Sequence, residues 1–483
     1  MTNCATTGLE AYVPSADVPW DVGRVQHLFR RIGYGAKPSE IQQALELGPT
    51  ETVRLLLDGA LQQPQPDEPE WAYMDYDAVT AFLEGTEREP FELYVDLGYD
   101  HLEKALEYGV REKLSLFWQN HFVTQYESHS CPSYHYQYLK VINEYALGDF
   151  KEFVKEITYT PAMLFFLNGF ENTRQQPNEN YARELFELFT LGENNGYTED
   201  DIVEASRALT GWNGWTSYCG GVEWTTWGFD DTDKTVFGQT GNYDYRSLVD
   251  MLFEQKADLI AEFICGKLYR HYVNIAPDAG VIRAMATTFQ QNDWRIEPVL
   301  RELFLSAHFF DDANVGTLIK NPMEIMVSFL RQGDFGTFED YLPWGFWGMA
   351  QMGQQLGQPP DVAGWTGDRA WIDSNRLTLR WDFLSGYSWA VHNASESTYP
   401  NFAKLLSDNS NSPEIIAREI VDYFVPRGFL TEEAYELATD VLKWDVPANY
   451  YDTGEWNLDW GSASWQIVVL LRHIARIPEF QLN

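Results

Sequence analysis

The chain has 483 residues, of which 45% are hydrophobic and 15% are aromatic, so it is long enough to bury a substantial core. Lys and Arg number 34 against 72 Asp and Glu, which gives a formal net charge of −38 at pH 7. A surface this negative repels phosphate backbones, so we expect no nucleic-acid partner. High environmental salt, bound cations or a cationic partner would each account for the charge. No apolar run approaches the roughly 18 residues that a membrane-spanning helix needs, so no membrane span is expected.

Helical periodicity dominates the chain. Ser39 is predicted to cap the second helix, and Thr198 with Asp201 forms a predicted capping box. Pro177 is expected in the first turn of another helix. The patterns predict helices over residues 25–32, 39–45, 101–117, 134–146, 150–168, 177–191, 198–210, 246–273, 279–291, 295–306, 376–387 and 464–476, with loops over 61–75, 353–371 and 441–462.

The stretch from residue 212 to 245 is rich in Gly, Trp, Thr and Asp and shows short alternations typical of strands. It predicts a small β-hairpin or loop excursion over residues 213–243. No linker and no internal repeat interrupts the helical pattern elsewhere. We therefore predict an all-α fold, a single helical domain over residues 1–483 with this small β excursion.

The four cysteines predict one disulfide. Cys265 lies in an apolar helical pattern and is expected to be a buried thiol. Cys4, Cys131 and Cys219 lie in loop-like sequence, and we expect two of these three to be bridged, with Cys131–Cys219 as the leading pair. Closing so long a loop stabilises a fold by about 4–5 kcal/mol in the chain-entropy model. The alternative is that all thiols are free in a reducing compartment.

The segment between Pro177 and Gly192 carries the leading candidate site. Advancing about 100° per residue separates an apolar arc from a charged arc. If the charged arc is buried, its carboxylates must share protons, which allows one to act as an acid and another as a base. The alternative interpretation is that the charged arc is the solvent-exposed face of an ordinary amphipathic helix. The residues assigned to the charged side are Glu179 and Glu187 as acid and base, Arg183 as orienting group, Asn178, Asn180 and Glu184 as substrate-binding groups, and Thr190.

Two further positions join this candidate site. His121 follows an apolar helix and is predicted to assist as a general base or metal ligand, with a structural histidine as the alternative. In the rigid loop at 357–365, Asp361 and Trp365 are predicted to line a cleft, and Trp365 with Trp371 to form a stacking platform for sugars. A purely structural loop is the alternative there.

The acidic run from Asp230 to Asp233 suits a hard cation such as calcium, although its spacing does not complete a helix–loop–helix calcium motif. The cofactor is therefore left unknown, with a divalent cation such as calcium as one option. The motifs of common serine hydrolases, nucleotide-binding proteins and zinc proteases are absent from the sequence.

Taken together, several motifs in the same order resemble the bacterial domain-of-unknown-function 1800 family. Members are usually predicted to be exported, so the resemblance implies a secreted or periplasmic protein and favours the disulfide. The chain begins without a basic and apolar leader, so export would require that a signal peptide was replaced by the start Met. The family pattern has a His-Asp pair where Phe229-Asp230-Asp231 stands here, so no histidine contributes at that place. The motifs are His27–Gly35, Trp118–Phe122, Pro161–Leu164, Pro177–Gly192, Arg207–Trp212, Lys234–Gly238 and Pro359–Trp365.

These observations lead to one functional hypothesis and two alternatives. The leading hypothesis is an exported enzyme, a hydrolase or lyase, acting on an extracellular polysaccharide through the carboxylate-lined helix. The alternatives are a non-catalytic secreted protein that binds or assembles cell-surface material, and a protein with a cation-dependent site.

Overall fold

The computed structural model describes residues 7–483, which fold mostly into helices joined by loops, so the predicted all-α class is confirmed. The first helices are α1 (Val22–Ile32), α2 (Pro38–Gln62), α3 (Tyr76–Phe82), α4 (Pro90–Glu107), α5 (Val110–His121), α6 (Tyr126–His129), α7 (Pro132–Tyr145), α8 (Phe150–Thr158), α9 (Pro161–Phe166), α10 (Asn180–Glu184) and α11 (Glu199–Ala208). They are followed by α12 (Tyr245–Gln255), α13 (Ala257–Tyr272), α14 (Ala279–Gln291), α15 (Ile296–Phe304), α16 (Pro322–Gly333), α17 (Tyr341–Gln351), α18 (Ser374–Ala394), α19 (Thr398–Leu406), α20 (Pro413–Phe424), α21 (Glu432–Leu442), α22 (Ala448–Asp452) and α23 (Ala463–Ile474). Short 3₁₀ or π segments are η1 (Gly169–Glu171), η2 (Leu185–Thr190), η3 (Asp312–Asn314), η4 (Asp368–Trp371) and η5 (Glu479–Gln481).

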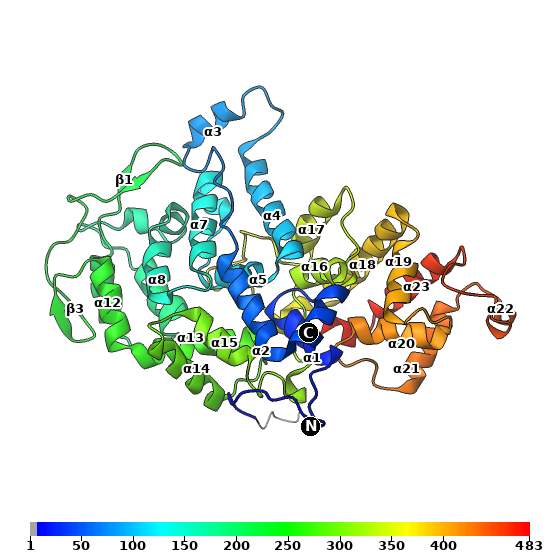
Figure 1. Ribbon diagram of the computed structural model, residues 1–483. Coiled ribbons are helices and arrows are strands. Elements are labelled where there is room, and N and C mark those ends of the chain that lie inside the picture. The colour runs from blue at the N-terminus through cyan, green and yellow to red at the C-terminus, as the bar shows by residue number, and fades with distance from the viewer. Residues whose placement is uncertain (1–6) are drawn as a thin grey trace.

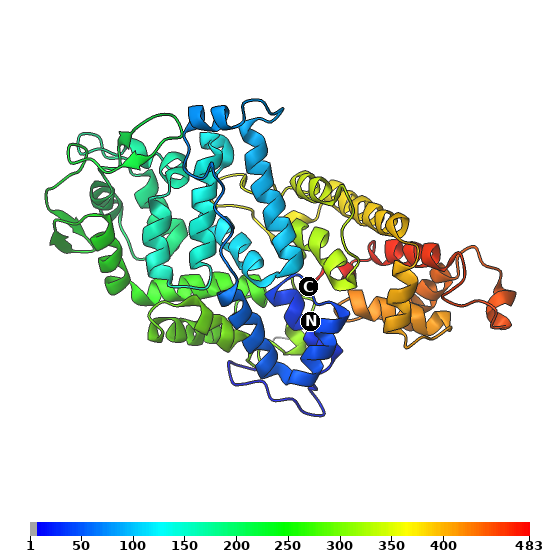
Figure 2. The same ribbon diagram turned by 45° about the horizontal axis from the view of Figure 1, so that its top comes forward.

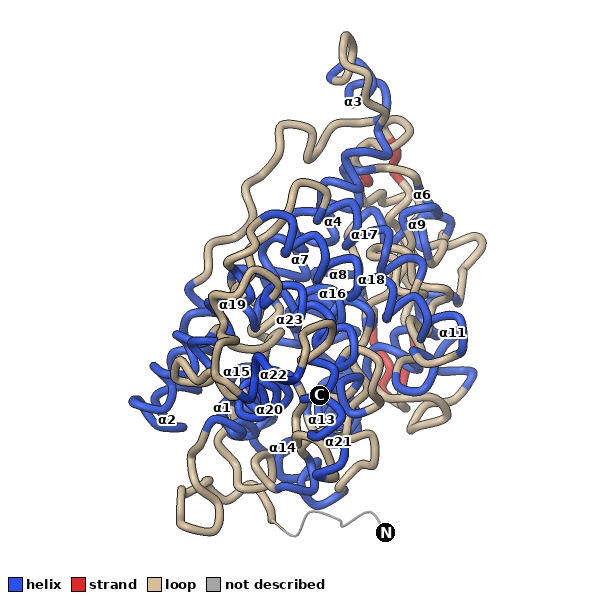
Figure 3. The backbone as a smooth tube through the Cα atoms, turned by 90° about the vertical axis from the view of Figure 1, so that its right-hand side faces the viewer, coloured by secondary structure: helices blue, strands red, loops and turns tan. Residues whose placement is uncertain are grey.

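The helices form an elongated molecule. In Figures 1 and 2, α8, α12 and α14 lie towards one end and α20, α21 and α22 towards the other, with α1, α5 and α16 between them. Helix α3 projects from the body at the end of α4, as Figure 3 also shows. None of the described helices has the length and apolar character that crossing a bilayer requires.

Loop-favouring residues divide two of the predicted helices. The helix expected over 101–117 is part of α4 and part of α5, because Gly109 between them adopts φ +85°, which a glycine tolerates far better than other residues. The helix expected over 150–168 breaks before Pro161, since proline disfavours helical backbone at the residue preceding it and donates no amide hydrogen bond.

Two predicted helix starts are wrong. Lys37, and not Ser39, occupies the N-cap of α2, and Pro38 takes the first helical position, where its missing N–H costs nothing. Pro177 lies in the loop before α10, which begins three residues later at Asn180. The capping box at Thr198 is confirmed, because its side chain accepts from the amide of Asp201 while the Asp201 carboxylate accepts from the amide of Thr198.

The β excursion and its disulfide are both confirmed. Antiparallel β1 (Gly214–Trp215) pairs with β2 (Val222–Glu223), and β3 (Lys234–Val236) pairs with β4 (Gln239–Gly241). Cys131 at the start of α7 is bonded to Cys219 in the β1–β2 connection, with Cα atoms 5.5 Å apart. Cys265 is a free, buried thiol, also as predicted, whereas Cys4 lies outside the described residues.

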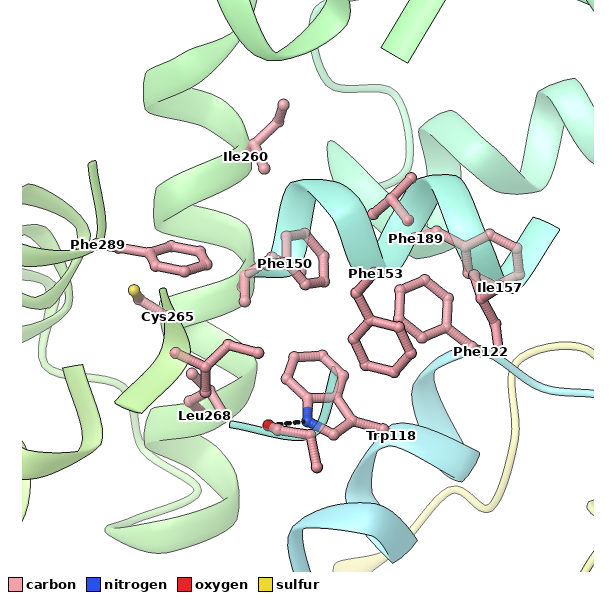
Figure 4. Packing of buried hydrophobic residues seen from close by; sticks show 14 of the residues in the cluster. Trp118, Phe122, Phe150, Phe153, Ile157, Phe189, Ile260, Cys265, Leu268 and Phe289 are labelled. Atoms are coloured by element: carbon pink, nitrogen blue, oxygen red, sulfur yellow. Dashed lines mark hydrogen bonds between the residues drawn. The ribbon is translucent and has the colours of Figure 1, made fainter. Parts of the chain in front are cut away.

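The buried hydrophobic residues form two large clusters that meet along α1. One cluster is built on α5, α7, α8 and α10–α15, and the other on α4, α16–α21 and α23. Trp118 lies inside the first, packed against Phe122, Phe150 and Phe153, while its indole N–H donates to the Ala146 carbonyl at 2.9 Å (Figure 4). Helix α1 contributes Leu28 to the first cluster and Phe29 to the second.

Buried cations join the two clusters. The Arg31 guanidinium donates to the carbonyls of Tyr272, Val273, Asn314 and Asn483, which come from segments far apart in the chain. Burial lowers the pKa of Arg31 to about 9. The motif at His27–Gly35 therefore has a structural role where the two clusters meet. Backbone carbonyls accept the hydrogen bonds of the Arg31 guanidinium, whose burial in an apolar interior would otherwise cost free energy.

Candidate functional site

The predicted charged helix changes its winding halfway. Helix α10 passes into the π segment η2, in which each turn holds an additional residue. The assignment of Thr190 to the charged side is therefore wrong: its side chain is fully buried, and its hydroxyl donates to the Leu185 carbonyl. A projection at 100° per residue cannot anticipate such a shift.

The charged side chains themselves form a cluster at the surface. Arg183 donates to Glu199 at 2.7 Å, to Glu187 at 3.2 Å and to Glu179 at 3.5 Å. Hydrogen bonding to Glu199 is the main reason that the pKa of Arg183 is raised. Side-chain exposure is 46% for Glu179 and 21% for Glu187, so water reaches both carboxylates. This arrangement resembles the ordinary polar face that was the alternative interpretation.

The remaining residues of that prediction have local partners. The amide of Asn180 donates to the Asn178 side chain at 3.0 Å, and the Asn180 side chain donates to Asn168 at 3.1 Å. Glu184 is half-buried, and desolvation followed by repulsion from Glu187 raises its pKa. The catalytic and substrate-binding roles assigned to this segment stay predictions.

The backbone of the same segment does meet His121, through Leu188 and Phe189. His121 Nε2 lies 3.1 Å from the Phe189 carbonyl oxygen, and its Nδ1 lies 2.9 Å from Nζ of Lys267 on α13. Lys267 also donates to the Leu188 carbonyl at 3.3 Å. These carbonyls lie at the end of the helix, where the last oxygens have no partner within the helix and carry the negative end of its dipole. His121 therefore lies close to this segment, as predicted, but it contacts the main-chain carbonyl oxygen of Phe189 and none of the charged side chains of residues 177–192.

The protonation state of His121 follows from these contacts. Desolvation, with repulsion from the Lys267 cation, holds the pKa of His121 well below its usual value, so the ring is neutral at pH 7. A carbonyl oxygen only accepts, so Nε2 carries the hydrogen and donates to Phe189. Nδ1 is therefore the acceptor for an N–H of Lys267.

His121 and Lys267 line a cavity of about 710 Å³ between α5, α13, α16 and the loop at 363–371. Its walls combine buried groups such as Glu324, Gln354 and Trp365 with exposed groups at the mouth such as Arg270 and Arg369. A cavity of this size lies within the usual range for ligand pockets. The lining residues are Leu116, Phe117, Asn120, His121, Lys267, Arg270, His271, Ile275, Leu318, Ile319, Asn321, Glu324, Gln354, Ala363, Trp365, Thr366, Gly367, Asp368, Arg369, Ala370 and Trp371.

The cavity is cationic. Within residues 7–483, Lys267, Arg270 and Arg369 form no ion pair. Burial lowers the pKa of Lys267 to about 8. The buried carboxylate of Glu324 is already neutralised by Lys113 at 2.7 Å, and this ammonium outweighs the effect of burial and keeps the pKa of Glu324 below its usual value. Asp368 is then the acidic group in the lining that has no cation bound to it in the described chain.

The predicted loop at 357–365 is held against the end of α5. The Asn120 side chain accepts from the Trp365 amide at 2.6 Å and donates to the Trp365 carbonyl at 3.3 Å. Trp365 and Trp371 both line the cavity but are only 5% and 7% exposed, so they offer little ring surface for stacking. The indole N–H of Trp365 is buried with no partner in the described structure and remains free to donate. Asp361 is exposed, accepts from the amide of Ala363 at 2.8 Å, and does not belong to the cavity lining.

An ion pair holds the acidic loop after residue 229 in place. Arg207 donates to Asp230 at 2.8 Å. Burial raises the pKa of Asp230, but hydrogen bonds from Thr232 and the Arg207 cation outweigh it and bring that pKa to about 2. The Lys234 ammonium donates to the Asp230 carbonyl. In the described chain, no group of three or more His, Cys, Asp or Glu side chains is arranged to hold a metal ion. The calcium option therefore stays a prediction without a geometric site.

The sequence patterns did not identify Lys267, Arg270 and Arg369 as candidate site residues. A usable signal existed for the first, because Lys267 occurs inside the apolar helical pattern and precedes His271 by one turn. A cation at such a position is either paired or functional. No signal distinguishes Arg369 from other loop arginines, since its role depends on where the loop folds.

The comparisons with known proteins identify one family. No curated protein and no solved structure matches the chain. The family model described as "Protein of unknown function (DUF1800)" matches residues 27–482, nearly the whole sequence. Three of the motifs that carried the resemblance contribute to the His121 environment: the end of α5, the segment ending at Gly192, and the loop ending at Trp365. The chain therefore belongs to the DUF1800 family.

Proposed function

We propose that this protein binds an acidic glycan of the extracellular space or cell surface in the α5–α13 cavity. The observation that carries the proposal is the set of Lys267, Arg270 and Arg369 around one cavity, without ion-pair partners in residues 7–483. In a chain of net charge −38, acidic residues outnumber basic ones two to one, so unpaired cations gathered in a cavity need an explanation. A carboxylate or sulfate group is the complement that satisfies them.

The walls of the cavity suit a polar ligand with an extended shape. Beside the cavity, the Trp365 indole N–H and His271 Nε2 are buried without partners among residues 7–483. Asn120, Gln354 and Thr366 add further polar groups. Sugars carry many hydroxyls that both donate and accept, so they match such a wall better than an apolar ligand does.

An extracellular location is part of the proposal. The Cys131–Cys219 disulfide supports it, because disulfides of this kind persist mainly in oxidising compartments. The polymer partner and the secreted or periplasmic location were both predicted from the sequence. Binding alone accommodates either an enzyme or a non-catalytic surface protein.

Calorimetric titration with oligogalacturonate tests the proposal. We expect binding by the wild type and at least tenfold weaker binding by the double variant R270Q/R369Q, because charge-assisted hydrogen bonds are lost. Arg283→Gln is the matched control, since Arg283 is an exposed arginine on α14 that forms no ion pair among the described residues. Neutral dextran oligosaccharides are expected not to bind. Equal affinities of the wild type and the double variant would contradict the proposal.

A second variant tests the predicted acid and base, Glu179 and Glu187. Glu187→Gln leaves the cavity intact, because Glu187 lies outside its lining. If the acid and base are Glu179 and Glu187, this variant loses activity on the glycan while keeping its affinity. If the cavity holds the chemistry, the variant behaves as the wild type.

A further inference from the structure

We propose that the Lys267 amine is the general base of an elimination reaction that cleaves a uronate-containing glycan, an inference that rests on the glycan binding proposed above. Three features of the cavity carry it: the hydrogen bonds at Nζ, the charges around Nζ, and the two arginines at the mouth.

The hydrogen bonds at Nζ leave one position free. A neutral amine has two N–H groups and one lone pair. His121 Nδ1 and the Leu188 carbonyl each accept one N–H, at 2.9 and 3.3 Å. Both acceptors are fixed, the first by the bond of His121 to Phe189 and the second by the helix end. The third position at Nζ is then the lone pair of the neutral amine, in a side chain that lines the cavity.

The surroundings make the neutral amine accessible near neutral pH, although the ammonium still predominates at pH 7. No carboxylate of residues 7–483 pairs with Lys267, and burial lowers its pKa to about 8, which suits a base that works near neutral pH. Phe263, whose ring centre lies 5.0 Å from Nζ, favours the ammonium slightly. The charged and titratable groups that share the cavity are Arg270 and His271 on α13, His121 on α5, Glu324 on α16, and Asp368 and Arg369 on the loop.

The arginines supply the other requirement of the reaction. A proton on the carbon next to a carboxylate is removed only when the charge that develops on that carboxylate is stabilised. Guanidinium groups do this by paired hydrogen bonds to both oxygens. Arg270 lies one turn after Lys267 on α13, and Arg369 lies at the same cavity on the facing loop. A carboxylate held at the mouth by these groups presents its neighbouring carbon to the amine.

The step balances without an oxidant, metal or cofactor. Lys267 Nζ takes the proton from C5 of the uronate, and the electrons of that C–H bond form a C4=C5 double bond. The bond from C4 to the glycosidic oxygen breaks, and that oxygen takes a proton from water in the open cavity. The Lys267 ammonium returns its proton to solvent. One chain becomes two, and the new non-reducing end carries an unsaturated uronate.

The substitution Lys267→Arg separates this role from binding. It keeps a cation in the cavity, but a guanidinium does not deprotonate in this pH range. With polygalacturonate, alginate and hyaluronan as probes, the ultraviolet absorbance of the unsaturated uronate reports product and calorimetry reports affinity. We expect the wild type to release product from at least one probe. We expect K267R to bind within about threefold of the wild type while its rate falls at least 100-fold, and Arg283→Gln to match the wild type in both.

The pH profile adds an independent readout. We expect kcat to rise with pH through about 8, as the amine loses its proton. His121→Leu removes the acceptor at Nδ1 that stabilises the ammonium, so the midpoint of this rise is expected to move to lower pH. Binding without unsaturated product on every probe, or product at an unchanged rate from K267R, would overturn the elimination and leave the binding proposal standing. Absence of binding would overturn both.

Discussion

The position of Lys267 in the fold determines the pKa of its amine. Its side chain lines the cavity beside α5 and the end of η2, and its partners are a neutral ring and a carbonyl. Burying a charged group without an opposite charge costs free energy, and the protein reduces that cost by lowering the pKa of the amine. Lys113 is paired with Glu324, whereas the buried Lys320 and Lys234, like Lys267, donate to backbone carbonyls. Lys267 differs from these lysines because it also lines the cavity.

The pKa of Lys267 predicts a pH dependence of stability. The amine titrates at about 8 when folded and near 10.5 when unfolded, so between these values the unfolded chain binds the additional proton. The free energy of unfolding therefore rises with pH across this window. Relative to Lys267→Met, the wild type is expected to gain up to about 3 kcal/mol between pH 7.5 and 10.5, because one pKa unit is worth about 1.4 kcal/mol. Denaturant titrations at several pH values measure the difference, and parallel curves for the two proteins would refute it.

Individual site residues were only partly predictable from the sequence. His121 was identified because it follows an apolar helix and belongs to a motif, and its neutral state follows from burial that only coordinates reveal. Glu179 and Arg183 were placed correctly on one face, but amphipathic spacing does not say whether that face meets water or protein. Arg369 was missed because its partnership with Lys267 spans about a hundred residues of chain.

At the scale of elements, the loop at 357–367 completes the cavity by attaching to α5 and α6. The amide of Tyr126 donates to the Gly357 carbonyl at 2.9 Å, and the Gln125 side chain donates to the Pro359 carbonyl at 2.6 Å. Asn120 holds both polar groups of the Trp365 backbone. The sequence predicted a rigid loop from its prolines and glycines, yet the attachment site depends on side-chain amides whose targets are distant in sequence.

Two glycines of this loop make a matched pair for testing that attachment. Gly364 and Gly367 both adopt positive φ, at +84° and +75°. A Cβ at Gly364 would lie 2.3 Å from the Asn120 Oδ1 atom, whereas a Cβ at Gly367 would meet only Trp371 Nε1, at 3.9 Å.

The two alanine variants are therefore expected to differ. Gly367→Ala bears only the cost of the backbone conformation, about 1–3 kcal/mol, because φ +75° with ψ −171° is a region that essentially only glycine adopts. Gly364→Ala must also displace Asn120, and we expect its loss to be larger by about 1–3 kcal/mol. Thermal unfolding monitored by circular dichroism compares them, and a similar loss in both variants would show that Asn120 does not hold the loop.

At the scale of the whole molecule, the Cys131–Cys219 bond fastens the β excursion to the helical body. The surrounding contacts agree, since the Tyr218 hydroxyl donates to the His129 carbonyl at 2.7 Å and Ser217 donates to Asp75 at 2.6 Å. The bond closes a loop of 88 residues. The general position of the excursion was predictable from its composition, but its placement against α7 was fixed only by choosing the correct cysteine pair.

Removing this bond is expected to destabilise the protein. The double variant C131A/C219A should lose about 2–5 kcal/mol of stability, because the unfolded chain is no longer constrained. A reductant at high concentration should lower the melting temperature of the wild type towards that of the variant and leave the variant unchanged. A wild type whose melting temperature is insensitive to reductant under denaturing conditions would argue against the bond.

The net charge of −38 predicts that salt acts in opposite directions on folding and on binding. Like charges spread over the surface repel one another in the folded state, and salt screens that repulsion. Between 0.05 and 1 M sodium chloride the Debye length falls from more than 10 Å to about 3 Å. The melting temperature should therefore rise over this range of salt concentration. The contact between the cationic cavity and an acidic glycan is screened by the same ions, so its affinity should fall over the same range. Because Lys267 is more enclosed than Arg270 and Arg369, the double variant R270Q/R369Q should lose most of the salt dependence of binding while keeping that of folding. Parallel thermal and calorimetric titrations separate the two effects, and an affinity that rises with salt would exclude the cationic cavity as the binding site.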